Sequence, residues 1–257
     1  MSEFLGLIFP DQLGTLPTIL LVCMSFFTSA VTAAVGLGGG VALIAVMAML
    51  MPASALVPVH GVVQLGSNAG RALVQLKHVD WLIAFWFAIG AVFGAALGGS
   101  IVVELPAAVL KAGIGIFVLW VVWGRTPKLG KARKRAMAAA GFASTFLSMF
   151  FGAAGPIGAA VLATLNLPRH DFVANQAVTA LIMHVFKIIA FGLLGFAFAP
   201  WAGLIVMMIA SGFLGTVTGS YLLGRMEEKT FRTGFRWVMT ALALNLLWQA
   251  GRNWTAS

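Results

Sequence analysis

Long apolar runs, separated by short polar breaks, fill most of the chain. About 20 helical residues span the 30 Å core of a bilayer, so most of these runs predict transmembrane helices. Glycine and proline interrupt the apolar sequence at 36–40 and again at 152–156, and the pieces that follow have only about half the length of a span. The pattern predicts an all-α polytopic membrane protein with two re-entrant or V-shaped helix pairs. The runs cover 16–35, 37–51, 54–76, 80–103, 106–124, 137–166, 172–195, 200–223 and 231–250.

The broken segment occurs twice, about 116 residues apart, and each copy precedes a stripe of polar residues. The first copy ends at Pro52, and the second ends at Pro168. Duplicated broken helices are typical of secondary transporters built from two repeats. We therefore expect one transmembrane domain over 1–257, with repeat one at about 16–124 and repeat two at about 137–250. Each repeat is expected to hold a broken helix pair followed by three transmembrane helices. The matching stripes are His60, Gln64, Asn68 and Arg71, and Gln176, Ala180, His184 and Lys187.

Basic residues gather in the loop 125–136, between the two repeats. Clustered Lys and Arg beside membrane spans mark the cytoplasmic side. The net charge of +9 is therefore interpreted as a topology signal, compatible with anionic lipid headgroups, and not as a nucleic-acid site. When membrane crossings are counted in both directions from this loop, Lys77 lies on the cytoplasmic side and the uncharged loop 196–202 lies on the outer side. Each loop then lies opposite its counterpart in the other repeat, which predicts inverted repeats in an inner (plasma) membrane protein. The cluster comprises Arg125, Lys128, Lys131, Arg133, Lys134 and Arg135.

The stripes hold the candidate binding residues, because spacings of four, four and three place them on one helix face. A cation inside a span costs about 2.5–3.5 kcal/mol on insertion scales. The sequence predicts that Arg71 and Lys187 flank an anion site, with amides, hydroxyls and imidazoles as further donors. The alternative is that both side chains snorkel, Arg71 toward the cytoplasmic surface and Lys187 toward the outer one. The neighbouring donors are His60, Gln64, Asn68, Asn175, Gln176, Thr179 and His184.

The two histidines and the glycine breaks leave alternatives open. His60 and His184 are either packing residues or a route for proton coupling, and the coupling ion stays unknown. Glycines 38–40 allow a turn inside the membrane and leave backbone N–H groups free to attract an anion. Gly155 and Pro156 open the equivalent arm. Close helix packing is the other use of glycine, and it accounts for the remaining stretches. Those are Gly90, Gly94, Gly98 and Gly99, and Gly212, Gly215 and Gly219.

The run Val35-Gly36-Leu37-Gly38-Gly39-Gly40, its spacing to Pro52 and the element Lys77-His78-Val79-Asp80-Trp81 resemble the TauE/SafE (sulfite exporter, TSUP) family. The resemblance extends from about Thr15 to Trp248 and includes the weaker second copy at 151–156. It implies transport of sulfur-containing anions such as sulfite, thiosulfate, sulfoacetate or other organosulfonates. The chain departs from the family at Ala153-Ala154, where glycines are common, so the two half-sites are expected to be unequal.

The leading hypothesis is a secondary carrier that moves a small sulfur anion by alternating access. The predicted substrate-binding set adds Gly38, Gly39, Gly40 and Gly155 to the stripe residues. A passive anion channel on the same fold is the alternative. A membrane enzyme or electron-transfer subunit is disfavoured, because the spans lack a paired-His haem arrangement, a Cys cluster or a carboxylate dyad. With Cys23 as the single cysteine, neither a cofactor nor a metal is expected.

Overall fold

The computed structural model describes residues 10, 12–35, 38–102, 105–124, 133–222 and 228–255, and these form helices and turns without strands. The predicted all-α class is thereby confirmed for this part of the chain. The α-helices are α2 (Thr15–Val35), α3 (Gly39–Leu50), α4 (Ala53–Val74), α5 (Trp81–Val102), α6 (Ala107–Trp123), α7 (Ala136–Phe151), α8 (Gly155–Ala163), α9 (Arg169–Leu193), α10 (Ala202–Leu222) and α11 (Glu228–Thr255). Two short 3₁₀ turns, η1 (Leu76–His78) and η2 (Ala199–Trp201), precede α5 and α10.

Four helical stretches within the described residues are long and apolar enough to cross a membrane. They are Thr15–Ala33, Trp81–Val102, His170–Leu193 and Ala199–Gly219. Both expected breaks are present, because α2 and α3 are separate helices and the run 137–166 divides into α7 and α8. Gly36, Glu104 and the basic positions 125–131 lie outside the described residues.

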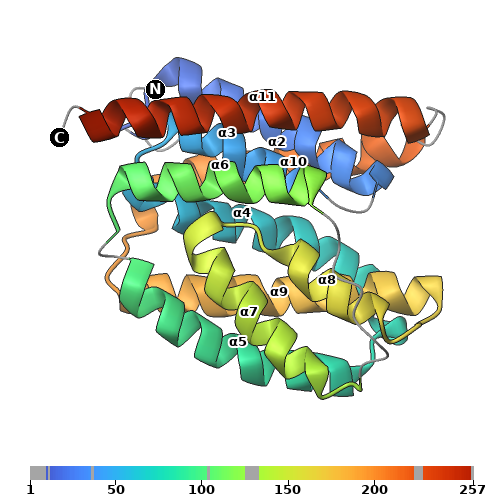
Figure 1. Ribbon diagram of the computed structural model, residues 1–257. Coiled ribbons are helices and arrows are strands. Elements are labelled where there is room, and N and C mark those ends of the chain that lie inside the picture. Colours follow the sequence, from blue (N-terminus) through green and yellow to red (C-terminus); the bar gives the residue numbers. More distant parts are fainter. Residues whose placement is uncertain are drawn as a thin grey trace.

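The helices pack in pairs that join distant parts of the sequence. α2 packs against α10, α5 against α7, and α6 against α11. In Figure 1, α11 (red) and α6 (green) cross the upper part of the molecule, α5 and α7 lie along its lower side, and α4 and α9 run between them. α4 and α9 are antiparallel, because Gly61 lies against Lys187 while His78, just beyond α4, bonds Asp171 near the start of α9.

Glycines allow the closest of these helix contacts. A Cβ at Gly90 of α5 would overlap the Ala138 carbonyl of α7, and one at Gly215 of α10 would overlap the Phe26 carbonyl of α2. Gly94, Gly98, Gly212 and Gly219 also face the partner helix at short range, which confirms the predicted packing role. Gly99 differs, since the nearest atoms to it belong to the side chains of Leu194, Met149 and Ala190 and not to a backbone.

The side chain of Asp80 joins the start of α5 to the residues just before α7. Its Oδ1 accepts the N–H of Leu82 at 3.0 Å, which caps α5, and its other oxygen pairs with Lys134 just before α7. Partial burial by itself raises the pKa of Asp80. The Lys134 ammonium and the amides of Ile83 and Leu82 outweigh that effect, so the pKa lies below its usual value. This carboxylate therefore stabilises the fold where it is ionised.

We expect Asp80→Ala to lower the stability of the detergent-solubilised protein by about 1 kcal/mol at pH 7, mainly through the lost helix cap. A lowered folded-state pKa gives a contribution that is complete above the unfolded value of about 3.9 and is lost below it. The stability gap between wild type and Asp80→Ala should therefore stay constant from pH 7 to pH 5 and narrow below pH 4. Thermal unfolding across this range measures the gap, and a gap independent of pH would contradict the assignment.

Candidate functional site

A small polar pocket lies where both broken segments meet α4 and α9. Its volume is about 70 Å³, and we call it the polar pocket. Backbone near the two breaks forms part of its wall, at Gly38, Gly40, Gly155 and Pro156. Residues from both predicted stripes supply most of the polar side chains, so the structure brings the stripes together in one place. The polar side chains that line the pocket are Thr32, Gln64, Asn68, Arg71, Gln176 and His184.

Arg71 supplies the positive charge of the polar pocket. Its Nη2 donates to Oδ1 of Asn68 at 2.6 Å, and the Asn68 amide donates to the Gln64 carbonyl at 2.7 Å. Asn68 lies one turn before Arg71, so the guanidinium reaches back along α4 instead of toward Lys77 in η1. A guanidinium has five N–H donors, and this bond leaves others for a ligand. A guanidinium at the wall of a pocket favours an anion over a cation.

Two helix N-termini also face the polar pocket. Gly38 has a left-handed φ of 103°. The Ala42 N–H donates to the Gly38 carbonyl at 2.9 Å, which is the first hydrogen bond of α3. The N–H groups before Ala42 therefore lie at the open end of α3. α8 begins at Gly155, which also lines the pocket. The N-terminal ends of two short helices therefore line the same pocket as Arg71, an arrangement that favours an anion.

The two breaks differ in their backbone conformation. In repeat one the left-handed residue is Gly38, just before α3. In repeat two it is Gly152, just after α7, with φ 72°, whereas Ala154 before α8 has φ −111°. A residue with negative φ does not need to be glycine. This explains why alanine is accommodated at 154, and it agrees with the expected inequality of the half-sites.

Five predicted residues lie outside the polar pocket. Gly39 is buried against α2, and Thr179 donates its hydroxyl to the Gln176 carbonyl within α9. Asn175 accepts the Asp80 N–H at 3.0 Å and donates to the Asp171 carbonyl, so it ties the start of α9 to the turn before α5. The other two, His60 and Lys187, lie deeper in the protein.

His60, His184 and Lys187 form a buried layer next to the polar pocket. Their exposed fractions are 0%, 3% and 0%. The His60 Nε2 bonds the Gly40 carbonyl at 3.0 Å, and the Lys187 Nζ donates to the Gly152 carbonyl at 2.7 Å. The two imidazole rings lie 6.2 Å apart in an edge-on arrangement. We call these three side chains the central layer, and it holds a carbonyl at each of the two breaks.

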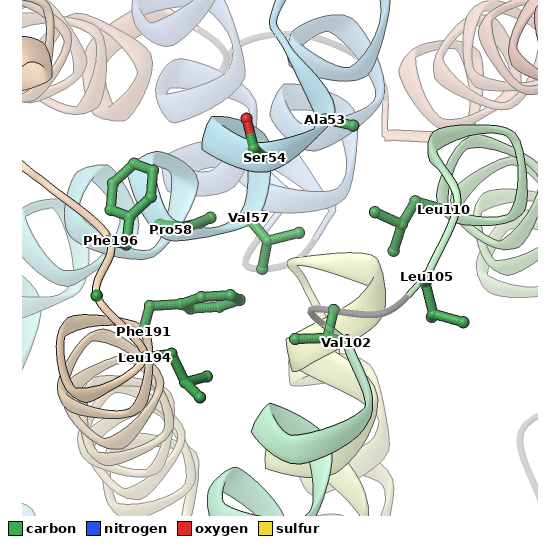
Figure 2. Close-up of a pocket in the computed structure, with 11 residues that line it drawn as sticks. Ala53, Ser54, Val57, Pro58, Val102, Leu105, Leu110, Phe191, Leu194 and Phe196 are labelled. Atoms are coloured by element: carbon green, nitrogen blue, oxygen red, sulfur yellow. The ribbon is translucent and has the colours of Figure 1, made fainter.

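A larger, mainly apolar cavity lies beyond the central layer. Its volume is about 420 Å³, and we call it the apolar vestibule. Figure 2 shows Val57 of α4, Phe191 of α9 and Leu110 of α6 around it. The start of α4 and the end of α9 line the vestibule, whereas the second half of α4 and the middle of α9 line the polar pocket. The two cavities therefore lie at different levels along the α4–α9 pair, with the central layer between them.

Sequence reasoning missed the hydroxyl groups of α2 and α7. Thr32 lines the polar pocket, and a Cβ on Gly39 would meet its hydroxyl. On α7, Ser144 and Thr145 are buried, and their side-chain oxygens have no hydrogen-bond partner in the described part of the chain. The signal was present, because the hydroxyl residues recur at the spacing of the repeat. They are Thr28, Ser29 and Thr32 in the first copy and Ser144, Thr145 and Ser148 in the second.

The charges around the site favour an anionic ligand. Among the described residues, the wall of the polar pocket contains the Arg71 guanidinium and no carboxylate. Asp80 and Asp171 lie at the ends of helices, where they pair with Lys134 and His78. The described part of the chain also holds no cluster of His, Cys, Asp and Glu side chains suited to a metal ion.

The comparisons with known proteins identify the family. A comparison with curated proteins and one with solved structures gave no match. The family model described as Sulfite exporter TauE/SafE matches residues 21–246, which is most of the chain and includes both breaks, the polar pocket and the central layer. Together with the apolar helices, this match shows an integral membrane protein of a transporter family. The chain belongs to the TauE/SafE sulfite exporter family.

Proposed function

We propose that the protein is a secondary carrier that binds a small sulfur oxyanion in the polar pocket. The observation that carries the proposal is the convergence of the Arg71 guanidinium with two helix N-termini in one small cavity. Sulfite and related oxyanions present several acceptor oxygens around a central sulfur, and they fit a ring of donors of this kind. Gln64, Asn68 and Gln176 add amide donors, and the family match supports the same substrate class.

The size of the polar pocket favours the smallest members of that class. One water needs roughly 10–15 Å³ of such space. At about 70 Å³, the pocket has room for roughly five to seven water-sized atoms. Sulfite, sulfate and thiosulfate fall within this size, whereas sulfoacetate carries an additional carboxymethyl group. We therefore propose an inorganic sulfur oxyanion as the preferred ligand of this conformation.

We further propose that transport proceeds by alternating access between two inverted repeats. α4 and α9 begin at equivalent positions of the repeat, just after Pro52 and Pro168, and they run antiparallel. Inversion about an axis in the membrane plane relates equivalent helices in this way. The pairing of α5 with α7 and of α10 with α2 repeats the same relation. The central layer between the two cavities supports a carrier with a closed barrier instead of an open pore.

Ligand protection of the purified protein tests the proposed substrate class. Thermal unfolding is measured at constant ionic strength with sulfite, thiosulfate, sulfate, sulfoacetate or chloride. We expect saturable stabilisation by at least one inorganic sulfur oxyanion, with about 2.7 kcal/mol gained at 100 times its Kd. Sulfoacetate should bind more weakly, and chloride should have no saturable effect. Equal protection by chloride would contradict an oxyanion site, and tighter binding of sulfoacetate would contradict the size argument.

A further inference from the structure

Lys187 is a buried amine for which the structure provides no negative partner. Its side chain is 0% exposed, and its Nζ donates to the Gly152 carbonyl at 2.7 Å. An ammonium has three N–H donors, and this is the one acceptor recorded for it among the described residues. A buried ammonium normally needs a counter-charge, because losing its hydration costs far more free energy than one carbonyl returns.

The helices packed against α9 do not supply that counter-charge. In their described parts, α5, α7 and α8 contain no titratable side chain. α4 contributes His60, next to Lys187, and Arg71, farther along in the polar pocket. On α9 itself, His184 lies one turn away. Lys77 and His78 of η1 lie at the far end of α9, where Asp171 pairs with His78.

The two histidines do not supply the counter-charge for Lys187 either. The Gly40 carbonyl only accepts hydrogen bonds, so the Nε2 of His60 must donate to it at 3.0 Å. Within the described residues, neither the Nδ1 of His60 nor the Nδ1 of His184 has a hydrogen-bond partner. An imidazole is neutral or positive, so neither ring supplies a negative charge. The central layer therefore contains three ionisable nitrogen bases and no acid.

We propose that Lys187 takes up a proton when an anion enters the polar pocket, so that the carrier moves the anion and a proton together. This inference rests on the proposed function, because the anion in the polar pocket is the missing counter-charge. His184 belongs both to the pocket wall and to the central layer, which places the anion next to the Lys187 environment. The proton comes from solvent to Nζ on anion binding, and it returns to solvent when the anion leaves on the other side.

Anion binding and protonation of Lys187 must influence each other by thermodynamic linkage. If the anion favours the ammonium form of Lys187, the ammonium form favours the anion by the same factor. Anion affinity should therefore fall as the pH rises through the range in which Lys187 loses its proton. A divalent anion such as thiosulfate that travels with one proton still moves one net negative charge, so its transport would respond to both the pH gradient and the membrane potential. A monovalent anion that travels with one proton would respond to the pH gradient alone.

Proton uptake during anion binding tests the inference directly. Thiosulfate is the probe, because it remains fully deprotonated between pH 5 and 9, whereas sulfite itself takes up a proton near neutral pH. Calorimetric titration of the purified wild-type protein in buffers of different ionisation enthalpy gives the number of protons taken up per bound thiosulfate. We expect a value of about one at a pH where the empty protein holds Lys187 neutral. Binding without proton uptake at every pH would overturn the inference and leave the oxyanion carrier standing.

Three substitutions locate the proton. Lys187→Gln keeps a donor for the Gly152 carbonyl, and Lys187→Arg keeps a permanent charge. Both should bind thiosulfate without proton uptake, whereas the matched control His60→Asn, which keeps a donor for the Gly40 carbonyl, should retain it. Uptake that persists in both Lys187 variants would overturn the assignment to Lys187, and its additional loss in His60→Asn would place the proton on His60. Should neither Lys187 variant fold, the wild-type titration alone decides. Failure of the wild type to bind thiosulfate, sulfite or sulfate would instead overturn the proposed function and this inference with it.

Discussion

Arg71→Gln is expected to weaken thiosulfate or sulfite binding by at least about a hundredfold, which corresponds to roughly 3 kcal/mol. The guanidinium is the full positive charge in the described wall of the polar pocket, and its bond to Asn68 holds it there. Glutamine removes the charge but keeps a polar side chain at this partly exposed position. The yield and thermal stability of the variant should therefore stay close to wild type. Anion-dependent thermal shifts measure both the affinity and the stability in one series.

Two further variants show whether the effect belongs to the pocket. Lys77→Gln removes an exposed positive charge in η1, just after the same helix, and should leave binding unchanged. Arg71→Lys keeps the charge but loses the planar fork, so intermediate affinity is expected where oxyanion geometry matters. Wild-type affinity in Arg71→Gln would place the anion site elsewhere. An equal loss of anion affinity in Lys77→Gln would mean that Arg71 acts only through the net charge of the surface.

Alanine at two equivalent glycines should affect different properties, folding at Gly39 and anion binding at Gly155. A Cβ at Gly39 would overlap the backbone carbonyl of Thr28, which cannot move without shifting α2. We expect Gly39→Ala to cost about 1–3 kcal/mol or more and to lower the yield of monodisperse protein. Gly155 holds the matching position in repeat two, where, among the described residues outside its own helix turn, no atom lies within 4 Å of the added Cβ. Gly155→Ala should therefore fold normally, with reduced anion affinity because the methyl group narrows the polar pocket.

Size-exclusion profiles and thermal unfolding of the two variants check this contrast. A stable Gly39→Ala protein would mean that α2 and the first turn of α3 are less tightly packed than the structure has them. A destabilised Gly155→Ala protein would mean that the first turn of α8 packs against other parts of the chain. Unchanged anion affinity in a stable Gly155→Ala would remove this wall from the binding site.

The helix pattern could be predicted closely from the sequence, because prolines and polar breaks mark the ends of the helices clearly. Pro52 and Pro168 set the starts of α4 and α9 within a few residues, and the uncharged runs between polar breaks set the other helices. Membrane spans combine a fixed length with continuous hydrophobicity, so their number and order depend little on tertiary contacts. The paired helices were not predictable in this way, since packing partners depend on surfaces that no local pattern specifies.

The binding site could be predicted only in part, because periodicity gives a helix face but not a depth. Gln64, Asn68, Arg71, Gln176 and His184 do line one pocket, as the stripes indicate. The repeat places Lys187 in register with Arg71, and one would expect them at one ligand. α4 and α9 are antiparallel, however, so Lys187 lies against Gly61, ten positions before Arg71 and roughly 15 Å along the helix.

Asn175 shows a second limit of pattern reasoning. Its position one residue before Gln176 suggests a further amide donor, yet its side chain bonds the Asp80 N–H and the Asp171 carbonyl. Those partners come from the turn before α5 and from the preceding turn of α9. A long-range contact of this kind is decided by tertiary packing. The place of Thr32 could not be predicted for the same reason, since it reaches the polar pocket through the packing of α2 beside the first turn of α3.

Counterflow in proteoliposomes is the most direct measurement of whether this protein is an oxyanion carrier that uses the polar pocket. Vesicles with wild type or Arg71→Gln are loaded with unlabelled sulfite or thiosulfate, and entry of the labelled anion is followed over a range of concentrations. A carrier with its site at Arg71 predicts saturable uptake that preloading accelerates, that excess chloride does not suppress, and that Arg71→Gln abolishes. Linear, unsaturable flux that is indifferent to preloading and equal in the two proteins would contradict it and indicate a passive pore.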